Sequence, residues 1–252
     1  MNKRVEMKVI NIKEIARETV EMTLQNEYLA THAKPGQFLH ILVEGHTLRR
    51  PISITDINQD DQTLTIIFKI IGKGTGNLAK YKVGQSLDVL GPGGQGFPTE
   101  GLTAKTVLLI GGGVGVPPLY FLAKQLAKDP SINIMTILGF QSKEFVFYEE
   151  KFKQFGETIV MTDDGSYGEQ GFVTDALQKV QAFDRFYTCG PTPMLRAVSS
   201  KLAIYEGYIS LEEYMGCGVG ACFACIIPTA DGSSYRKICQ DGPVFPANEV
   251  RL

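Results

Sequence analysis

The sequence predicts an α+β multidomain chain: an N-terminal antiparallel β-barrel, a central α/β domain with a parallel sheet, and a small cysteine-rich C-terminal domain. Short β-type runs separated by turns fill the first hundred residues, and apolar strands then alternate with helical stretches. Four of the five cysteines gather near the carboxyl terminus. We expect the three domains to span residues 1–100, 101–208 and 209–252.

The composition favours ordinary globular domains. Hydrophobic residues make up 44% of the 252 residues, which is enough for proper cores. The net charge of −2 gives no reason to expect nucleic acid or an anionic membrane as a partner. No apolar run is long enough to cross a bilayer, and the first residues lack the apolar core of a signal peptide. We therefore expect a cytoplasmic protein, whose thiols stay reduced and available to metals.

The first hundred residues consist of short β-type runs. Residues 21–24 and 38–43 alternate in polarity, and residues 63–71 are rich in β-branched side chains. Turn signals such as Pro35-Gly36 separate these runs. Many short strands without helical periodicity indicate a small antiparallel barrel.

Two segments of the predicted barrel have the chemistry of an anion site. Residues 49–54 (RRPISI) place two arginines before a proline, and an arginine grips a pyrophosphate through two parallel hydrogen bonds. Residues 72–80 (GKGTGNLAK) form a glycine turn that leads into a helix, whose first N–H groups favour phosphate. Taken alone, each segment also fits a purely structural alternative. Residues 49–54 could be a solvated basic strand edge, and residues 72–80 could be a flexible hairpin turn.

The central region opens with a strand, a glycine turn and a helix. Residues 106–110 (TVLLI) form a predominantly apolar run, residues 111–115 are GGGVG, and residues 119–128 have helical character. This arrangement places a pyrophosphate at a helix N-terminus. The G-x-G-x-x-G fingerprint itself is not met, because Val116 takes the last position. Dinucleotide binding is therefore indicated by the arrangement rather than by the fingerprint.

Further strands alternate with helical stretches and predict a parallel sheet. The strands are expected at 133–138, 158–161 and 185–188, and the helices at 145–152, 173–180 and 193–205. Ligands of such sheets bind at the carboxyl ends of the strands. In a typical NAD site, an acidic residue at the end of the second strand binds the ribose. The predicted strand 133–138 is followed by no such residue, so the sequence leaves the choice between NAD and NADP open. Cys189 ends another strand, where it either lies beside a nicotinamide or fills a small buried space.

The cysteine-rich segment has the spacing C-x4-C-x2-C followed by a distant fourth cysteine. These are Cys217, Cys222, Cys225 and Cys239, and the spacing is that of plant-type [2Fe–2S] clusters. Small residues between them let backbone N–H groups approach the sulfurs. A structural zinc site and a disulfide framework are the alternatives, although only one C-x2-C pair is present and the cysteine count is odd.

Other polar residues give no signal of a site. His32, His40 and His46 lack a metal-ligand spacing or an acidic partner, so we expect structural or surface roles for them. Asp163-Asp164 fits a turn better than an acid–base pair. Ser166 has no nucleophile-elbow context.

The ordered set of motifs resembles one family along nearly the whole chain. It comprises RPISI, KIIGKGTGNLAK, GPGGQGF, LIGGGVGVPPLY, MTDDGSYGEQGFVTDAL, YTCGPTPML and GCGVGACFACIIPT…KICQDGPVF. The barrel and the α/β domain resemble the ferredoxin–NADP reductase superfamily. The cysteine segment and its closing CQDGPVF resemble the electron-transfer subunits of type B dihydroorotate dehydrogenases.

This resemblance implies three cofactors and their sites: FAD, NAD and a [2Fe–2S] cluster. It implies FAD contacts at Arg50, Pro51, Ile52, Ser53, Ile67, Phe68, Lys69, Gly74 and Thr75. It implies an NAD pyrophosphate over Gly111, Gly113 and Gly115, with Gly190, Pro191 and a catalytic Cys189 near the nicotinamide. It implies cluster ligands at Cys217, Cys222, Cys225 and Cys239. One departure is Ile52, which stands where many members carry a tyrosine that stacks on the flavin, so stacking must come from another residue.

The resemblance also implies a function and a partner. The partner is an FMN-containing catalytic subunit that oxidises dihydroorotate in pyrimidine biosynthesis, in a heterotetramer of two copies of each chain. Electrons are expected to pass from that FMN through the cluster and FAD to NAD+, since a cluster moves single electrons and a hydride carries two. The alternatives are a reductase subunit of a related hydrogenase or glutamate-synthase-like complex, and a non-catalytic iron–sulfur redox sensor.

Overall fold

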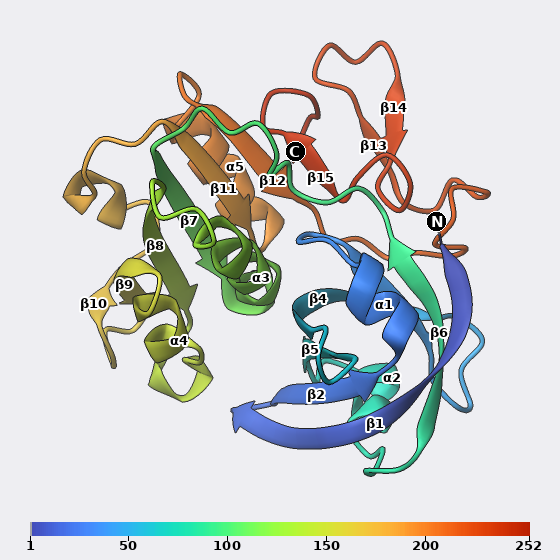
Figure 1. Cartoon of the computed structure of the whole chain (residues 1–252). Coiled ribbons are helices and arrows are strands. Elements are labelled where there is room, and N and C mark those ends of the chain that lie inside the picture. The colour runs from blue at the N-terminus through green and yellow to red at the C-terminus, as the bar shows by residue number, and fades with distance from the viewer. Residues whose placement is uncertain (1) are drawn as a thin grey trace.

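A computed structural model describes residues 2–252 of the chain as a closed barrel, a seven-stranded sheet and a short hairpin (Figure 1). The barrel carries the N-terminal third of the chain. The sheet follows it, and the C-terminal segment lies against both. This arrangement confirms the predicted α+β fold class.

The barrel closes through six antiparallel strands in the order β1-β2-β5-β4-β3-β6. They are β1 Lys3–Ala16, β2 Thr19–Gln25, β3 Phe38–Leu42, β4 Arg50–Asn58, β5 Thr63–Lys69 and β6 Ser86–Gly93. Alternate residues such as Met22, Leu39 and Ile66 fill the interior, because successive side chains of a strand point to opposite faces. Two short helices, α1 (Glu27–His32) and α2 (Lys73–Leu78), connect strands of the barrel.

The central sheet has the order β10-β9-β8-β7-β11-β12-β15. Its strands are β7 Thr106–Gly112, β8 Asn133–Phe140, β9 Gly156–Thr162, β10 Glu169–Gln170, β11 Arg185–Cys189, β12 Glu206–Ser210 and β15 Val244–Pro246. All neighbours pair in parallel except β12 and β15. The strand order reverses between β7 and β11. Ligands of open α/β sheets bind at this point, outside the carboxyl ends of the strands.

Helix α3 (Val116–Leu126) joins the sheet to the barrel. It begins directly after the short turn η1 (Gly113–Gly115) and is buried along most of its length, because it lies between the sheet and strand β4 (Figure 1). Lys124 Nζ donates to Asp56 Oδ1 of β4 at 2.7 Å. Packing and an ion pair therefore hold the two units together.

The C-terminal segment extends both units. After β12, residues 211–225 lead to the hairpin of β13 (Ile226–Pro228) and β14 (Tyr235–Lys237), and β15 returns antiparallel to β12. The final strand thus belongs to the central sheet. Strand β12 continues to Ser210, beyond the predicted boundary at residue 208. The division into three domains stays a prediction.

Two helices predicted from apolar periodicity are shorter than expected. Over residues 145–152 the α-helix α4 begins only at Glu149, because Val146 has extended backbone angles. Over residues 173–180 only a 3-10 turn forms, η3 (Ala176–Lys179). There Val173 packs so closely over Gly139 of β8 that a Cβ on Gly139 would lie 2.5 Å from its Cγ1. Val173 is therefore apolar because it packs against the sheet, and not because it belongs to a helix. The helix predicted over 193–205 forms as α5 (Thr192–Lys201), which starts within one residue of its predicted start but ends four residues before its predicted end.

Candidate cofactor sites

Backbone N–H groups point at the sulfur of Cys217 in the cysteine-rich loop. Val219 N lies 3.4 Å and Cys222 N 3.3 Å from Cys217 Sγ, and both donate to it. Burial alone would raise the pKa of the Cys217 thiol, but these donors stabilise the thiolate and bring its pKa to about 6. The thiolate is the form that binds a metal.

Cys225 and Cys239 lie side by side in the interior of the same loop region. Burial and a hydrogen bond to Cys225 raise the pKa of Cys239 to about 12, while Gly220 N donates to Cys239 Sγ at 3.1 Å. The Cys239 thiol therefore needs a nearby positive charge to lose its proton, and a metal centre supplies it. Within residues 2–252, no group of three or more His, Cys, Asp or Glu side chains is placed so that it could hold a single metal ion. A two-iron cluster instead takes two thiolates on each iron, and the donor set of four cysteines fits it.

A cavity of about 390 Å3 opens on the barrel where the FAD was predicted. Eight of the nine predicted FAD contacts line it: Arg50, Pro51, Ile52, Ser53, Ile67, Phe68, Lys69 and Thr75. They come from β4, β5 and α2, which brings residues far apart in the sequence to one place. The ninth residue, Gly74, lies directly behind Arg50, and a Cβ there would fall 2.2 Å from Arg50 Nε. The residues fit a flavin with its pyrophosphate near Arg50, and the assignment of each contact stays a prediction.

His46 is a residue of this site that the sequence did not indicate. Its Nδ1 lies 3.2 Å from Arg50 Nη2, and its Nε2 lies 3.2 Å from Asn77 Nδ2. An arginine only donates, so His46 Nδ1 accepts from it and the imidazole fixes the guanidinium beside the cavity. No sequence pattern indicates this role, because His46 meets Asn77, 31 residues further along the chain, only in the folded structure.

A second cavity of about 530 Å3 lies at the switch point of the central sheet. The predicted residues Gly113 and Pro191 line it, and so does Asp163, which was expected to be only a turn residue. Burial, with a further contribution from Asp164, raises the pKa of Asp163. The sequence located the two loops of this site because both follow parallel strands, and paired register between Gly111 and Cys189 brings them together.

Cys189 and three predicted glycines lie behind this second cavity rather than on its wall. The Cys189 side chain is fully buried, and burial raises the pKa of its thiol well above the usual value. A Cβ on Gly115 would lie 2.2 Å from the Cys189 carbonyl oxygen, so only glycine allows this close approach. Gly111 and Gly190 also pack against protein atoms. A catalytic role of Cys189 stays a prediction, and its buried thiol favours the packing alternative.

Glu212 connects the two cavities and was missed by the sequence analysis. Together with Lys69 and Val114 it lines both of them. The carboxylate is exposed to the cavities, yet desolvation by the surrounding protein raises its pKa. The barrel site and the sheet site are therefore adjoining parts of one crevice.

The barrel cavity also adjoins the cysteines. Phe38 and Met215 line the cavity and belong to the same buried cluster as Cys225 and Cys239. Continuous protein packing thus connects the predicted FAD site to the predicted iron–sulfur site. His40, expected to be structural or exposed, is buried on the same strand as Phe38 and faces the cysteine loop at Gly218.

Comparisons with known proteins agree with this arrangement. The family model "Iron-sulfur cluster binding domain of dihydroorotate dehydrogenase B" matches residues 212–251, and "Oxidoreductase NAD-binding domain" matches residues 109–200. The electron transfer subunit of dihydroorotate dehydrogenase B (NAD(+)) of Bacillus mycoides is 49% identical over the full length of both chains. The same subunit of Shouchella clausii is 48% identical over 99% of both chains.

Solved structures share the fold. The structure of an NADH-dependent reduced ferredoxin-NADP oxidoreductase superposes with a TM-score of 0.88 at 31% identity, over 97% of this chain and 89% of that chain. A ferredoxin NADP+ reductase from Neisseria gonorrhoeae superposes with a TM-score of 0.68 at 16% identity, over 80% of this chain and 91% of that chain. The second likeness concerns the fold alone.

The fold and its sites define an oxidoreductase of the ferredoxin–NADP reductase superfamily with FAD, NAD and [2Fe–2S] cofactors. Within this superfamily, the chain belongs to the family of the electron transfer subunits of dihydroorotate dehydrogenase B (NAD(+)). Among residues 2–252, no helix is both long and apolar enough to cross a membrane.

Proposed function

We propose that this chain transfers electrons between a dihydroorotate-oxidising catalytic subunit and NAD+. The partner carries FMN, and the complex contains two copies of each chain. We place the complex in the cytoplasm, where thiolates remain reduced and able to hold iron. The proposal rests on the family membership and on one structural observation, the position of the barrel cavity between the other two sites.

The barrel cavity adjoins both the sheet cavity and the buried cysteines. Glu212 lines it together with the sheet cavity, and Phe38 packs between it and the buried cysteines. When bound, the cluster supplies one-electron transfer, and FAD couples this to two-electron exchange with NAD. The protein holds these sites in fixed contact, excludes water between them with Phe38 and Met215, and exposes a carboxylate where the two cavities meet.

The charged residues of the sheet cavity support NAD as its ligand. They are Lys69, Asp163 and Glu212, which together carry more negative than positive charge. A 2′-phosphate, which distinguishes NADP, is usually held by an added arginine. We assign the predicted residues Arg50, Ser53 and Thr75 to FAD, and Gly113 and Pro191 to NAD, as part of this proposal.

The experiment is affinity purification of the tagged chain from its native host, followed by a dihydroorotate-driven NAD+ reduction assay. We expect co-purification of an FMN-containing chain, a flavin and iron–sulfur absorption spectrum, and NADH formation that depends on both chains. A colourless protein with stoichiometric zinc contradicts the proposal. Co-purification with a hydrogenase or a glutamate-synthase-like chain would instead identify the protein as the reductase subunit of that complex. If NADH fails to reduce a dye through the purified protein, the result favours a redox sensor.

A further inference from the structure

His40 lies on the outer face of strand β3, between the barrel and the cysteine loop. Leu39 and Ile41 point into the barrel, so the strand's alternation places Phe38 and His40 on the outside. Both outer side chains are nevertheless buried, with exposed fractions of 3% and 1%. The C-terminal segment covers this face of the barrel, and the two rings meet edge to face with centroids 6.4 Å apart.

The ring of His40 is a buried polar group that makes no hydrogen bond of full geometry with residues 2–252. Neither Nδ1 nor Nε2 has one, although nearly all buried polar groups in proteins are bonded. A neutral imidazole carries one N–H donor that needs an acceptor. Gly218 lies against this ring so closely that a Cβ on it would fall 2.2 Å from His40 Nδ1. Gly218 directly follows Cys217, whose backbone stands toward the imidazole as a hydrogen-bond acceptor. It opposes the lowering of the His40 pKa by burial and by the charges of Arg49 and Arg50.

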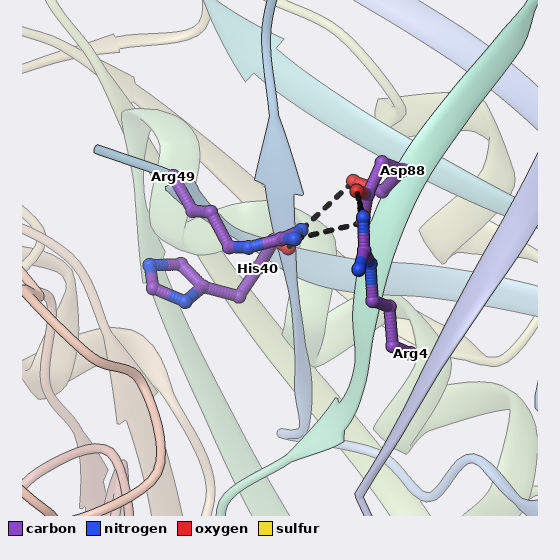
Figure 2. Close-up of polar contacts among 4 residues, drawn as sticks. All are labelled: Arg4, His40, Arg49 and Asp88. Carbon is purple, nitrogen blue, oxygen red and sulfur yellow. Dashed lines mark hydrogen bonds and ion pairs between the residues drawn. The ribbon is translucent and has the colours of Figure 1, made fainter. Parts of the chain in front are cut away.

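The main chain of His40 is held in place from the opposite side. Arg49 Nη1 donates to the carbonyl oxygens of His40 and Asp88, at 3.1 and 3.0 Å, and Arg49 Nη2 donates to Asp88 Oδ1 at 2.8 Å. Arg4 also bonds this carboxylate. Figure 2 shows the imidazole turned away from Asp88 and Arg4. The backbone of β3 is thus clamped to β6, while the ring is directed elsewhere.

We propose that His40 is a positioning residue of the iron–sulfur loop, and that its ring N–H donates a hydrogen bond to the backbone carbonyl of Cys217. This inference rests on the proposed electron-transfer function, since it assigns the loop to a cluster. It makes His40 the contact through which the FAD barrel fixes the place of one cluster ligand. Hydrogen bonds and ligand orientation around the sulfurs set the reduction potential of such a cluster.

The test compares two variants of the full chain that differ in the donor alone. His40→Asn keeps an N–H donor near the position of Nδ1, and His40→Leu removes it. We expect the His40→Asn cluster to keep the parent's midpoint potential and electron paramagnetic resonance spectrum. His40→Leu should show a more negative potential and an altered spectrum, or should lose iron, because the loop is no longer held. Redox titration of the purified protein measures this without any turnover assay.

The inference is overturned when the two variants behave alike, whether both match the parent, both shift or both lack iron. His32→Leu serves as the control, since His32 is an exposed histidine on α1. The flavin absorption of each variant reports whether the barrel is intact. A parent chain without iron would instead overturn the proposed function, so the two failures are distinguishable.

Discussion

The guanidinium of Arg50 lies directly against the backbone of Gly74, close enough that a Cβ at position 74 would fall 2.2 Å from Nε. Arg50 belongs to β4 and Gly74 to α2, so the two halves of the predicted phosphate site meet at this contact. His46 fixes the same guanidinium from another side. The position of Arg50 therefore depends on the absence of a side chain at residue 74.

Gly74→Ala is expected to weaken FAD binding while leaving the fold intact. The added methyl group displaces the guanidinium, which is the mobile end of a long side chain, so the backbone need not shift. Loss of a charged hydrogen bond to phosphate costs about 1.5–3 kcal/mol, or roughly ten- to a hundredfold in FAD affinity. Calorimetric titration of the apoprotein with FAD measures the change.

Gly76→Ala is the matched control in the same helix. A Cβ at Gly76 would have only one neighbour within 4 Å, Ile70 Cγ2 at 3.9 Å, which is an ordinary contact. Both substitutions raise helix propensity equally. Equal FAD affinities of the two variants would refute the role of the Arg50–Gly74 contact.

Tyr214 is expected to take the place of the aromatic residue that Ile52 does not supply. Its side chain lines the FAD cavity and is 88% exposed, which leaves the ring free to stack. Tyr214→Ala should lower FAD affinity by a factor of about 2–10, corresponding to about 0.5–1.5 kcal/mol for an aromatic pair. Ile204→Ala, at an equally exposed site, should bind FAD as the parent does. Unchanged affinity of Tyr214→Ala would assign stacking to a different residue.

Cys239→Ser is expected to remove the cluster and to separate two activities. The variant should lose its iron and its dihydroorotate-driven NAD+ reduction, while FAD stays bound and NADH still reduces a dye directly. Iron analysis and the two assays measure this. Cys189→Ser should keep its full iron content, because Cys189 lies apart from the loop in the core of the sheet. Retention of dihydroorotate-driven activity without iron would disprove the proposed order of electron transfer.

The contact between Glu21 and Tyr148 predicts a pH-dependent stability. Burial alone would raise the pKa of Glu21, but the Tyr148 hydroxyl, Lys13 and Lys151 together bring it below its usual value of 4.5. A carboxylate with a lowered pKa in the folded state stabilises the fold above the unfolded-state pKa. This contribution is therefore complete above pH 4.5 and is lost as the pH falls through the lower folded-state value.

Glu21→Gln should lower the free energy of unfolding at neutral pH by about 1–3 kcal/mol. The difference from the parent should shrink as the pH falls below the usual value of 4.5, because the parent then loses the same contribution. Urea unfolding from neutral pH to about pH 3 measures both curves. The exposed Glu157 provides the control, and Glu157→Gln should follow the parent at every pH. A constant difference between Glu21→Gln and the parent would contradict the assigned titration.

The sequence predicted the sites that depend on short stretches of chain. Each of them carries its chemistry within a few residues, so a local pattern is enough to predict it. They are the cysteine spacing, the strand–glycine–helix unit and the segment 50–53, and the role of each residue stays a prediction. The lengths of the helices over 145–152 and 173–180 were wrong, because burial of residues such as Val173 against the sheet imitates a helical pattern.

By itself, the sequence determined the fold class, the family and the three cofactors, since motif order and spacing are properties of the chain alone. Only the tertiary structure decided which residues face one another across the domains. Glu212 between two cavities, His46 beside Asn77 and His40 against Gly218 all depend on contacts between segments far apart in the chain. The physical reason is that strand alternation fixes which side chains share a face, while packing of the whole molecule decides what covers that face.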